Sequence, residues 1–337
     1  MRSLACLLSL IAVACDGAPV DPDAAVTPDA AGRDAHVSLP DSAVEPDAGV
    51  AGAPVWVGAG PWGLRSSTRD GDAWETIANP AQADDHTPDL FRAVAVGGGV
   101  IVAVGGDRNS RIDRSLDGVR WEEDLHPAGT QWLGGVAYLD GLWVAGGGVG
   151  EVVRSTDGAR TWERGGRAPS AVRAIAAGDG RFVAVGDGGM IAVSSDGLAW
   201  DDRTRAGSLR FSQVAHHAGT WLVAGSEWNG GGFDTECFVS TDTITWTPCP
   251  FDGGAIRGVF VTDGRLFVAH ASGHEHTRDG ARWERGAAQI PAHVFLADGR
   301  WVGAEDDRRY AGASLDALAQ TRADRGFRAF AWGRLAP

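Results

Sequence analysis

Four arginines occupy the same place in four similar apolar segments, and arginines arranged in this way can bind anions. Each stands second in its segment, after a large apolar residue, as in the run 91–96. The arginines are Arg92, Arg173, Arg257 and Arg328, and a fifth segment has His293 in the corresponding place. A guanidinium group pairs with a carboxylate through two parallel hydrogen bonds. If the segments are structurally equivalent, these side chains form a positive ring that suits a carboxylate or an acidic peptide. The alternative is that each arginine pairs with a carboxylate or carbonyl group of an adjacent repeat.

Two tryptophans stand outside the repeated pattern of the chain and are further candidates for ligand contact. Trp62 lies in a short loop rich in glycine, and Trp228 lies in the longer polar stretch 226–236. An exposed tryptophan is a common anchor for peptides and sugars. The alternative for both is that the indole ring folds back over its own loop.

Two groups of residues have side chains of the types that bind metal ions, but neither has the spacing of a known site. The first group holds His270, His274 and His276. The second group holds Asp107, Asn109 and Asp113. The histidines lack the spacing of a zinc site, and the second group lacks that of a calcium-binding loop. We therefore predict no metal and no cofactor.

A short motif recurs along the chain and defines the elements that must position these side chains. It consists of Ser or Thr, one residue, Asp, usually Gly, and then Trp three or four residues after that Gly position. The six copies are Thr68–Trp74, Ser115–Trp121, Ser155–Trp162, Ser194–Trp200, Ser240–Trp246 and Thr277–Trp283. A degraded seventh copy, Ser314–Gln320, lacks both Gly and Trp. The copies are about 40 residues apart, a period typical of β-propeller blades.

Each repeat also contains two apolar runs joined by a glycine turn, such as 91–96 and 100–105. Unbroken apolar runs are expected of strands that are covered on both faces. The motif follows as the turn between a third and a fourth strand. We therefore predict an all-β fold in which each repeat is one four-stranded blade of a β-propeller.

The motif itself has a structural explanation. The Asp carboxylate can accept backbone N–H groups across the turn, Gly permits a positive φ, and Trp buries a large surface between blades. The pattern resembles the Asp-box (BNR) repeat, although the usual form has one more residue between Asp and Gly. In that family the Asp and Trp are structural, so we assign Asp117, Asp157, Asp196 and their counterparts to the fold.

The ends of the repeat region predict seven blades and a closed ring. The first blade, entered near residue 55, lacks a first strand. The C-terminal run 327–333 is a close copy of 91–97, which begins the next blade. We expect this run to complete the first blade, which would close the ring and cover both edges of the sheet.

Residues 55–337 also resemble the seven-bladed propellers related to photosystem II assembly factors, as seen in the stretch 143–162. That resemblance implies an arginine patch on one face, here Arg92, Arg173, Arg257 and Arg328. Sialidases also carry Asp-boxes on a propeller, and they need a tyrosine nucleophile and an acidic proton donor. The chain has only Tyr138 and Tyr310, and the arginine signature of that family is absent. We therefore identify no catalytic residue and expect no enzyme activity.

The N-terminal residues predict export and a lipid anchor. One arginine, an apolar run too short to span a bilayer and then small residues indicate a signal peptide over residues 1–14. The residues before Cys15 resemble a bacterial lipobox, which implies a lipid on Cys15. Cleavage near residue 14 without lipidation is the alternative. Residues 15–54 are rich in Asp, Ala and Pro and poor in large apolar side chains, so we predict a disordered tether.

Two cysteines remain once Cys6 is removed with the signal peptide and Cys15 carries a lipid. Cys237 and Cys249 flank the fifth motif almost symmetrically, where two strands of a hairpin would lie side by side. In an exported protein this arrangement predicts a cross-strand disulfide.

The charge of the chain argues against nucleic acid as a partner. The net charge is −14, and residues 16–54 hold eight acidic residues against one arginine, so the propeller itself is only mildly acidic. A protein of this kind is a poor partner for nucleic acid. We expect a monomeric lipoprotein of the bacterial cell envelope that binds an acidic protein or peptide. The alternative is a glycan-binding or sialidase-like protein, because the same arginines suit acidic sugars.

Overall fold

The computed structural model describes residues 52–77, 90–123, 125–127, 130–251, 254–286, 288–305, 308–323 and 327–335. The predicted signal peptide, Cys15 and all but the last three residues of the predicted tether lie outside these ranges. Within the described residues, no helix is long and apolar enough to cross a bilayer.

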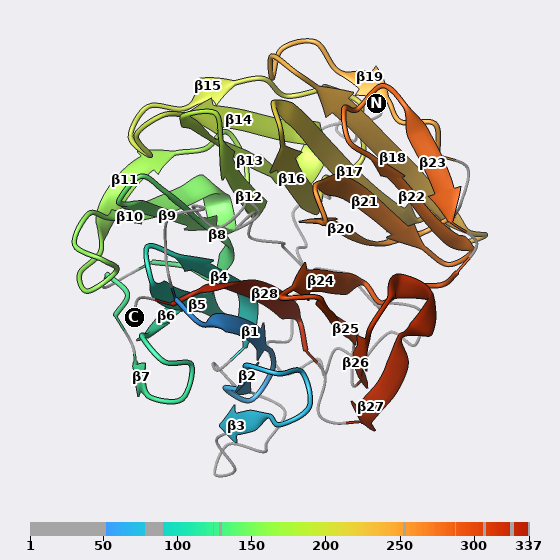
Figure 1. Ribbon diagram of the computed structural model, residues 1–337. Coiled ribbons are helices and arrows are strands. Elements are labelled where there is room, and N and C mark those ends of the chain that lie inside the picture. Colours follow the sequence, from blue (N-terminus) through green and yellow to red (C-terminus); the bar gives the residue numbers. More distant parts are fainter. Residues whose placement is uncertain are drawn as a thin grey trace, which may run out of the picture. The chain divides into compact units, whose positions relative to one another are not determined.

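Seven four-stranded antiparallel sheets are arranged in a ring around a central axis (Figure 1). In each blade the strands follow one another outward from the axis, as the alternation of apolar runs and turns predicted. The all-β, seven-bladed β-propeller expected from the repeats is thereby confirmed.

The first three blades take up the N-terminal part of the described chain. Blade 1 consists of β28 (Ala329–Arg334), β1 (Pro54–Ala59), β2 (Arg65–Thr68) and β3 (Glu75–Ile77). Blade 2 consists of β4 (Phe91–Gly97), β5 (Val100–Gly106), β6 (Ser110–Ser115) and β7 (Trp121–Glu122). Blade 3 consists of β8 (Leu133–Leu139), β9 (Leu142–Gly147), β10 (Glu151–Ser155) and β11 (Glu163–Arg167).

The other four blades follow in sequence order. Blade 4 consists of β12 (Val172–Gly178), β13 (Arg181–Gly186), β14 (Met190–Ser194) and β15 (Asp201–Asp202). Blade 5 consists of β16 (Gln213–His217), β17 (Thr220–Trp228), β18 (Phe233–Ser240) and β19 (Thr247–Pro248). Blade 6 consists of β20 (Ile256–Thr262), β21 (Arg265–His270), β22 (Gly273–Thr277) and β23 (Trp283–Gly286). Blade 7 consists of β24 (His293–Ala297), β25 (Arg300–Glu305), β26 (Arg308–Gly312) and β27 (Ala319–Ala323). Three 3-10 turns complete the described elements: η2 (Gly148–Gly150), η3 (Asp187–Gly189) and η4 (Leu315–Ala317).

The ring closes through the two ends of the described chain. β28 pairs with β1 in an antiparallel register from Pro54 opposite Arg334 to Ala59 opposite Ala329. β28 (red) therefore supplies the innermost strand of a blade whose other strands come from the N-terminal end (blue, Figure 1). This is the closure that the sequence predicted.

The inner strands have small or β-branched residues at places where neighbouring blades approach closely near the axis. Val94 of β4, Ile175 of β12 and Val259 of β20 are fully buried. Gly258 shows how close the blades come, since a Cβ atom there would lie 1.7 Å from the carbonyl oxygen of Ala292 in blade 7. Only glycine fits at that contact. Larger side chains are fully buried as well, including Trp143 in the second strand of blade 3 and Phe330 in the innermost strand of blade 1.

The repeated motif forms the turn that the sequence predicted. In blade 4, Asp196 Oδ1 accepts the backbone N–H groups of Leu198 and Ala199 at 2.8 and 3.1 Å. Gly197 has a φ of 71°, in the left-handed region that glycine adopts without strain. The Trp200 indole donates to the Gly197 carbonyl at 3.4 Å. The tryptophan thus closes the turn that the aspartate opens.

The six motif tryptophans are not equally buried. Two of them, Trp162 and Trp246, are buried as expected. The other four, Trp74, Trp121, Trp200 and Trp283, are half-buried.

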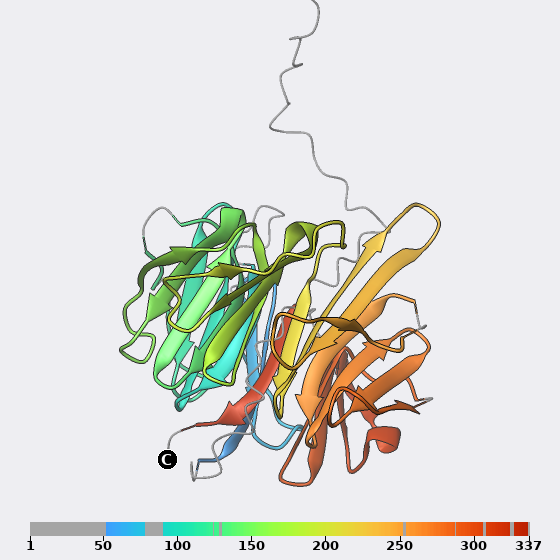
Figure 2. The same ribbon diagram turned by 90° about the horizontal axis from the view of Figure 1, so that it is seen from above.

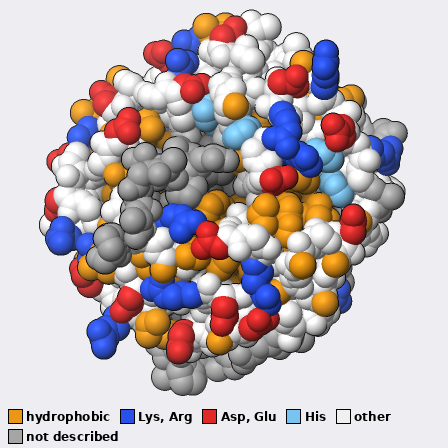
Figure 3. Space-filling view, in the orientation of Figure 1, with side chains coloured by type: hydrophobic (Ala, Val, Ile, Leu, Met, Phe, Trp, Pro, Cys, Tyr) orange, Lys and Arg blue, Asp and Glu red, His pale blue; other side chains and the backbone are white. Residues whose placement is uncertain are grey.

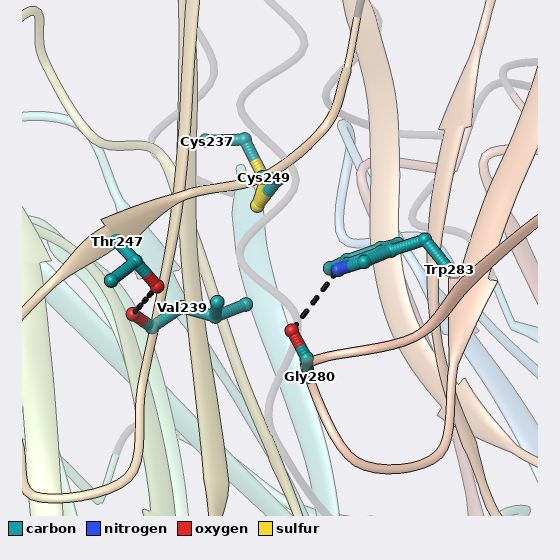
Figure 4. The surroundings of a disulfide bond; sticks show 6 residues. All are labelled: Cys237, Val239, Thr247, Cys249, Gly280 and Trp283. Carbon is teal, nitrogen blue, oxygen red and sulfur yellow. Dashed lines mark hydrogen bonds between the residues drawn. A yellow bond between two sulfur atoms is a disulfide. The ribbon is translucent and has the colours of Figure 1, made fainter.

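The predicted disulfide is present and joins Cys237 of β18 to Cys249, just after β19 (Figure 4). The two Cα atoms lie 5.3 Å apart, and the Cys249 backbone N–H donates to the Cys237 carbonyl at 2.9 Å. The bond therefore fixes the outermost strand of blade 5 to the strand before it.

Candidate functional site

The arginines stand where the inner strands begin, and a bulge directs three of them. The pairing of β4 with β5 shifts register between Phe91 and Ala93, which leaves Arg92 as the extra residue. Arg173 and Arg257 occupy the same bulged place in β12 and β20. A bulge redirects a side chain out of the regular alternation of a strand. We call the end of the ring where the inner strands begin the arginine face, and the other end the opposite face.

Arg173 and Arg328 are both close enough to Arg92 to act on it electrostatically. Burial lowers the pKa of Arg92, the charge of Asp107 opposes that effect, and the charges of Arg173 and Arg328 lower the pKa further. Arg328 immediately precedes β28, and its backbone N–H donates to the Ala59 carbonyl at 2.8 Å. Blades 1, 2 and 4 thus bring three guanidinium groups together on the arginine face.

Trp132 lies between two of these guanidinium groups and was not singled out from the sequence. Its ring centre is 5.2 Å from the guanidinium carbon of Arg92 and 4.9 Å from that of Arg173. Blade 3 has Gly134 at the bulged place, in the shift of register between Leu133 and Gly135. The tryptophan therefore fills the space of the missing arginine side chain and offers an aromatic face to both cations. The additional tryptophan two residues before a place that lacks the arginine was the available signal.

Two of the arginines also have carboxylate partners within the propeller. Arg173 makes a bidentate pair with Asp187 of its own blade, at 2.8 and 3.0 Å. Arg257 pairs with Glu305 of β25, in the adjacent blade. Arg92 donates through Nε to the Gly106 carbonyl at 3.2 Å. The alternative of pairing between blades therefore describes Arg257, whereas Arg173 and Arg92 bind groups of their own blades.

His293 does not lie with the arginines on the surface. Its first paired residue is Ala304, and the register of blade 7 puts Ala292 at the place that Arg92 holds in blade 2. The histidine is one residue further into the strand, where alternation turns its side chain into the protein. It is only 3% exposed, and burial lowers its pKa to about 3. The sequence shows an apolar segment but not which residues pair across its strands. The shift of His293 by one residue from the arginine position was therefore not visible in it.

The two candidate tryptophans outside the repeats have different surroundings. Trp62 is half-buried in the loop between β1 and β2, with a φ of 56°. Trp228 ends β17 and is 51% exposed. Figure 2 shows the ring edge-on. The β17–β18 hairpin that carries Trp228 leans outward from the ring there, at the end opposite to the one where β28 ends.

The side chains considered for metal binding are engaged in other ways. The described residues contain no group of three His, Cys, Asp or Glu placed to hold a metal ion. His270 Nε2 lies 2.7 Å from Glu275 Oε2, and His274 Nδ1 lies 3.0 Å from the Ala288 carbonyl oxygen. Asp113 is fully buried and pairs with Arg65 and Arg111.

The face viewed in Figure 3 carries acidic and basic side chains intermixed.

No family model matches the chain, and no curated protein matches it. Solved structures of β-propellers do match. The computationally designed Ika8 protein has a TM-score of 0.53 and 10% identity, over 83% of this chain and 91% of that one. The structure of YCF48 bound to D1 peptide has a TM-score of 0.51 and 17% identity, over 83% and 89%. The WD40 propeller domain of Doa1 has a TM-score of 0.52 and 16% identity, over 71% and 85%.

Identities this low establish a common fold and nothing finer. The chain is therefore a β-propeller, with seven blades in its own structure.

Proposed function

We propose that this chain is an exported, lipid-anchored bacterial protein whose propeller binds an acidic protein or peptide on the arginine face, without catalysis. Its role would be to help assemble components of the cell envelope. The observation that carries the proposal is the grouping of Arg92 and Arg173 around Trp132, with Arg328 close enough to Arg92 to act on it electrostatically. Guanidinium groups beside an aromatic ring offer a carboxylate positive charge next to an apolar surface.

The path of the chain supports a binding face that lies at the other end of the ring from the point where the tether joins. β1 starts beside Arg334, at the end of β28, and runs toward the start of β28 near Arg328. The chain therefore enters the propeller at the opposite face. A tether from a lipid on Cys15 would join the propeller there and not at the arginine face.

A glycan-binding or sialidase-like activity is the second candidate, since acidic sugars also carry a carboxylate. The tyrosines give it little support. Tyr138 lies near the end of β8 that is remote from the arginine face, with its ring centre 5.1 Å from that of Trp143. Tyr310 lies within β26, opposite Gly303.

A ligand screen distinguishes these functions. The full chain is tested by thermal shift and calorimetry against acidic peptides, sialic acids and acidic oligosaccharides. The Arg92→Gln/Arg328→Gln variant is tested beside it, and Arg181→Gln, near the start of β13 on the opposite face, is the matched control. We expect an acidic peptide to stabilise the wild type and the control but not the double variant. Binding of sugars alone would favour the second candidate. A double variant that is itself destabilised, with no ligand for the wild type, would mean that the arginines only hold blades together.

A further inference from the structure

The β17–β18 hairpin of blade 5 extends beyond the hairpins at the same place in other blades. Its two strands pair beyond the position where Gly225 lies opposite Glu236. The additional pairs end with Glu227 opposite Asp234 and Trp228 opposite Phe233. In blade 4 the pairing stops at the equivalent position, Gly186 opposite Met190. Since β17 runs past the start of β16, the additional pairs project on the side of the arginine face.

The extension is held in place by contacts on both of its sides. The Ile256 backbone N–H donates to Ser226 Oγ at 3.0 Å, and Thr235 Oγ1 donates to the Gly254 carbonyl at 3.2 Å. On the other side, the Leu209 backbone N–H donates to Glu236 at 3.0 Å. The disulfide at Cys237 fixes the base of the same strand. The tip is therefore presented on an ordered support, and little conformational entropy would be lost on binding.

The turn at the tip is ordered by its own hydrogen bonds. Asn229 Oδ1 accepts the backbone N–H groups of Gly231 and Gly232, both at 2.9 Å. Asn229 Nδ2 donates to Asp234 Oδ1 at 2.9 Å. The side chains on either side of the turn consequently have defined positions.

An aromatic pair at this tip is exposed to solvent. Trp228 is 51% exposed and Phe233 is 41% exposed, and their rings meet edge to face with centres 5.2 Å apart. The other large apolar side chains that are exposed in the described chain are single aliphatic residues on turns: Leu116, Val119, Val149, Leu198 and Ile244. Exposed apolar surface on a rigid projection marks an interaction site more often than isolated exposed residues do.

The charges around the aromatic pair define its partner. Residues 226–236 contain three acidic residues, Glu227, Asp234 and Glu236, and no basic residue. Arg210 lies 3.9 Å from Glu227 and offsets the charge of that carboxylate, so Asp234 is the carboxylate nearest the tip without a basic partner in this segment. The faces of Trp and Phe rings attract cations, and the adjacent carboxylates add to that attraction. The same charges repel anionic surfaces, so this tip differs in sign from the arginine cluster.

We propose that the β17–β18 tip is a second binding surface, which takes an extended protein segment with basic side chains next to apolar ones. The basic side chains would lie against the ring faces and the carboxylate of Asp234, and the apolar ones would cover Trp228 and Phe233. The proposal does not depend on ligand binding by the arginine cluster.

Three labelled synthetic peptides of equal length test the tip by fluorescence anisotropy on the full chain. One alternates Arg and Leu, one alternates Arg and Ser, and one alternates Glu and Leu. We expect the Arg–Leu peptide to bind at least about tenfold more tightly than either of the others. If the Arg–Ser peptide bound as tightly as the Arg–Leu peptide, the negative net charge of the chain alone would explain the binding, and the proposal would be overturned.

Variants then locate the binding. In Trp228→Thr/Phe233→Thr, a cross-strand threonine pair preserves the strand while it removes both rings. We expect this variant to lose about tenfold in affinity for the Arg–Leu peptide. Asp234→Asn keeps an acceptor for Asn229 and removes one charge, so it should show a smaller loss that high salt abolishes. Arg181→Gln, on the opposite face, should bind as the wild type does. Unchanged affinity in the double threonine variant, with hydrogen exchange showing an intact hairpin, would overturn the proposal. A concentration-dependent dimer that the same variant abolishes would overturn it in favour of self-association.

Discussion

At the scale of single residues, His293 is the clearest departure from the repeated pattern. The strand register gives the equivalent positions in blades 1 to 4 and in blade 6 to small residues, Ala329, Ala93, Gly135, Ala174 and Gly258. Within the described part of the chain, neither ring nitrogen of His293 has a hydrogen-bond partner. A buried imidazole in this position must stay neutral for the propeller to remain folded.

This burial predicts a loss of stability in mild acid. The folded-state pKa of His293 is about 3, below the value near 6.5 of an exposed histidine, so the unfolded chain binds the extra proton first. The free energy of unfolding should therefore fall as the pH decreases from about 6.5 toward about 3, by an amount on the order of a few kcal/mol. Urea unfolding of wild type and His293→Gln across this range measures it. His216 and His276 also have pKa values lowered chiefly by burial and persist in both proteins, so the difference isolates His293. Parallel curves would contradict the assignment.

The motif aspartates act on stability in the acid range as well. Hydrogen bonds from the backbone N–H groups of Thr245 and Ile244 lower the pKa of Asp242 to about 2, and equivalent bonds lower that of Asp196. Their stabilising effect is complete above the unfolded-state value near 3.8 and is lost as the pH falls through the lower folded-state value. We expect Asp196→Ala to lose about 1 kcal/mol at neutral pH, because the N–H groups of Leu198 and Ala199 lose their acceptor. Asp196→Asn should lose less stability than Asp196→Ala, because its side chain keeps an oxygen acceptor. Equal losses in the two variants, measured by chemical denaturation, would show that this acceptor does not stabilise the turn.

At the scale of elements, the contact between blades 1 and 2 contains one buried carboxylate with an arginine partner across the blades. Asp113 of β6 is fully buried, and it lies 2.7 Å from Arg65 of β2 and 3.1 Å from Arg111. Glu123, whose side chain is 49% exposed, also contacts Arg65 at 2.8 Å. The guanidinium of Arg65 stacks over the rings of Phe91 and Trp121 as well. Such a pair is costly to break, because its buried charges lose their partners.

Asp113→Asn should therefore destabilise the propeller by about 3 kcal/mol, since two guanidinium groups lose a buried counter-charge. Glu123→Gln is the matched control, and we expect it to cost about 1 kcal/mol or less because it is half-exposed. Equilibrium denaturation of both variants measures the difference. If Asp113→Asn were as stable as Glu123→Gln, the carboxylate would not hold these blades together.

At the scale of the whole molecule, the repeats allowed the architecture to be predicted but not the cluster on its surface. The spacing of the motif and the likeness of run 327–333 to run 91–97 predict seven blades and the closure, because both reflect the strands directly. The positions of Arg92, Arg173 and Arg257 at a shared place also follow from the repeat. Trp132 was missed because its role comes from contacts with two other blades. Asp113 was grouped with Asp107 and Asn109, whereas its partner Arg65 is 48 residues away on another blade.

The closure itself has a direct consequence for stability. β28 provides the innermost strand of blade 1, and Phe330 within it is fully buried. Deletion of residues 327–337 should prevent stable folding, because it exposes an edge of β1 and the buried side chains beside it. A control that lacks only residues 336–337 should melt as the wild type does. An unchanged melting temperature after the longer deletion would rule out the closure.

The central claim is that a carboxylate of an acidic peptide contacts the arginine cluster, and a double-mutant cycle tests it most directly. The affinity of the best acidic peptide and of its version with one Asp changed to Asn is measured for wild type and Arg328→Gln, since Arg328 is the exposed member of the cluster. We predict that one of the peptide's carboxylates shows a coupling energy of about 1 kcal/mol or more with Arg328 or, in a second cycle, with Arg92. Coupling energies near zero for every carboxylate with both arginines would contradict the account and remove the arginine face as the binding site.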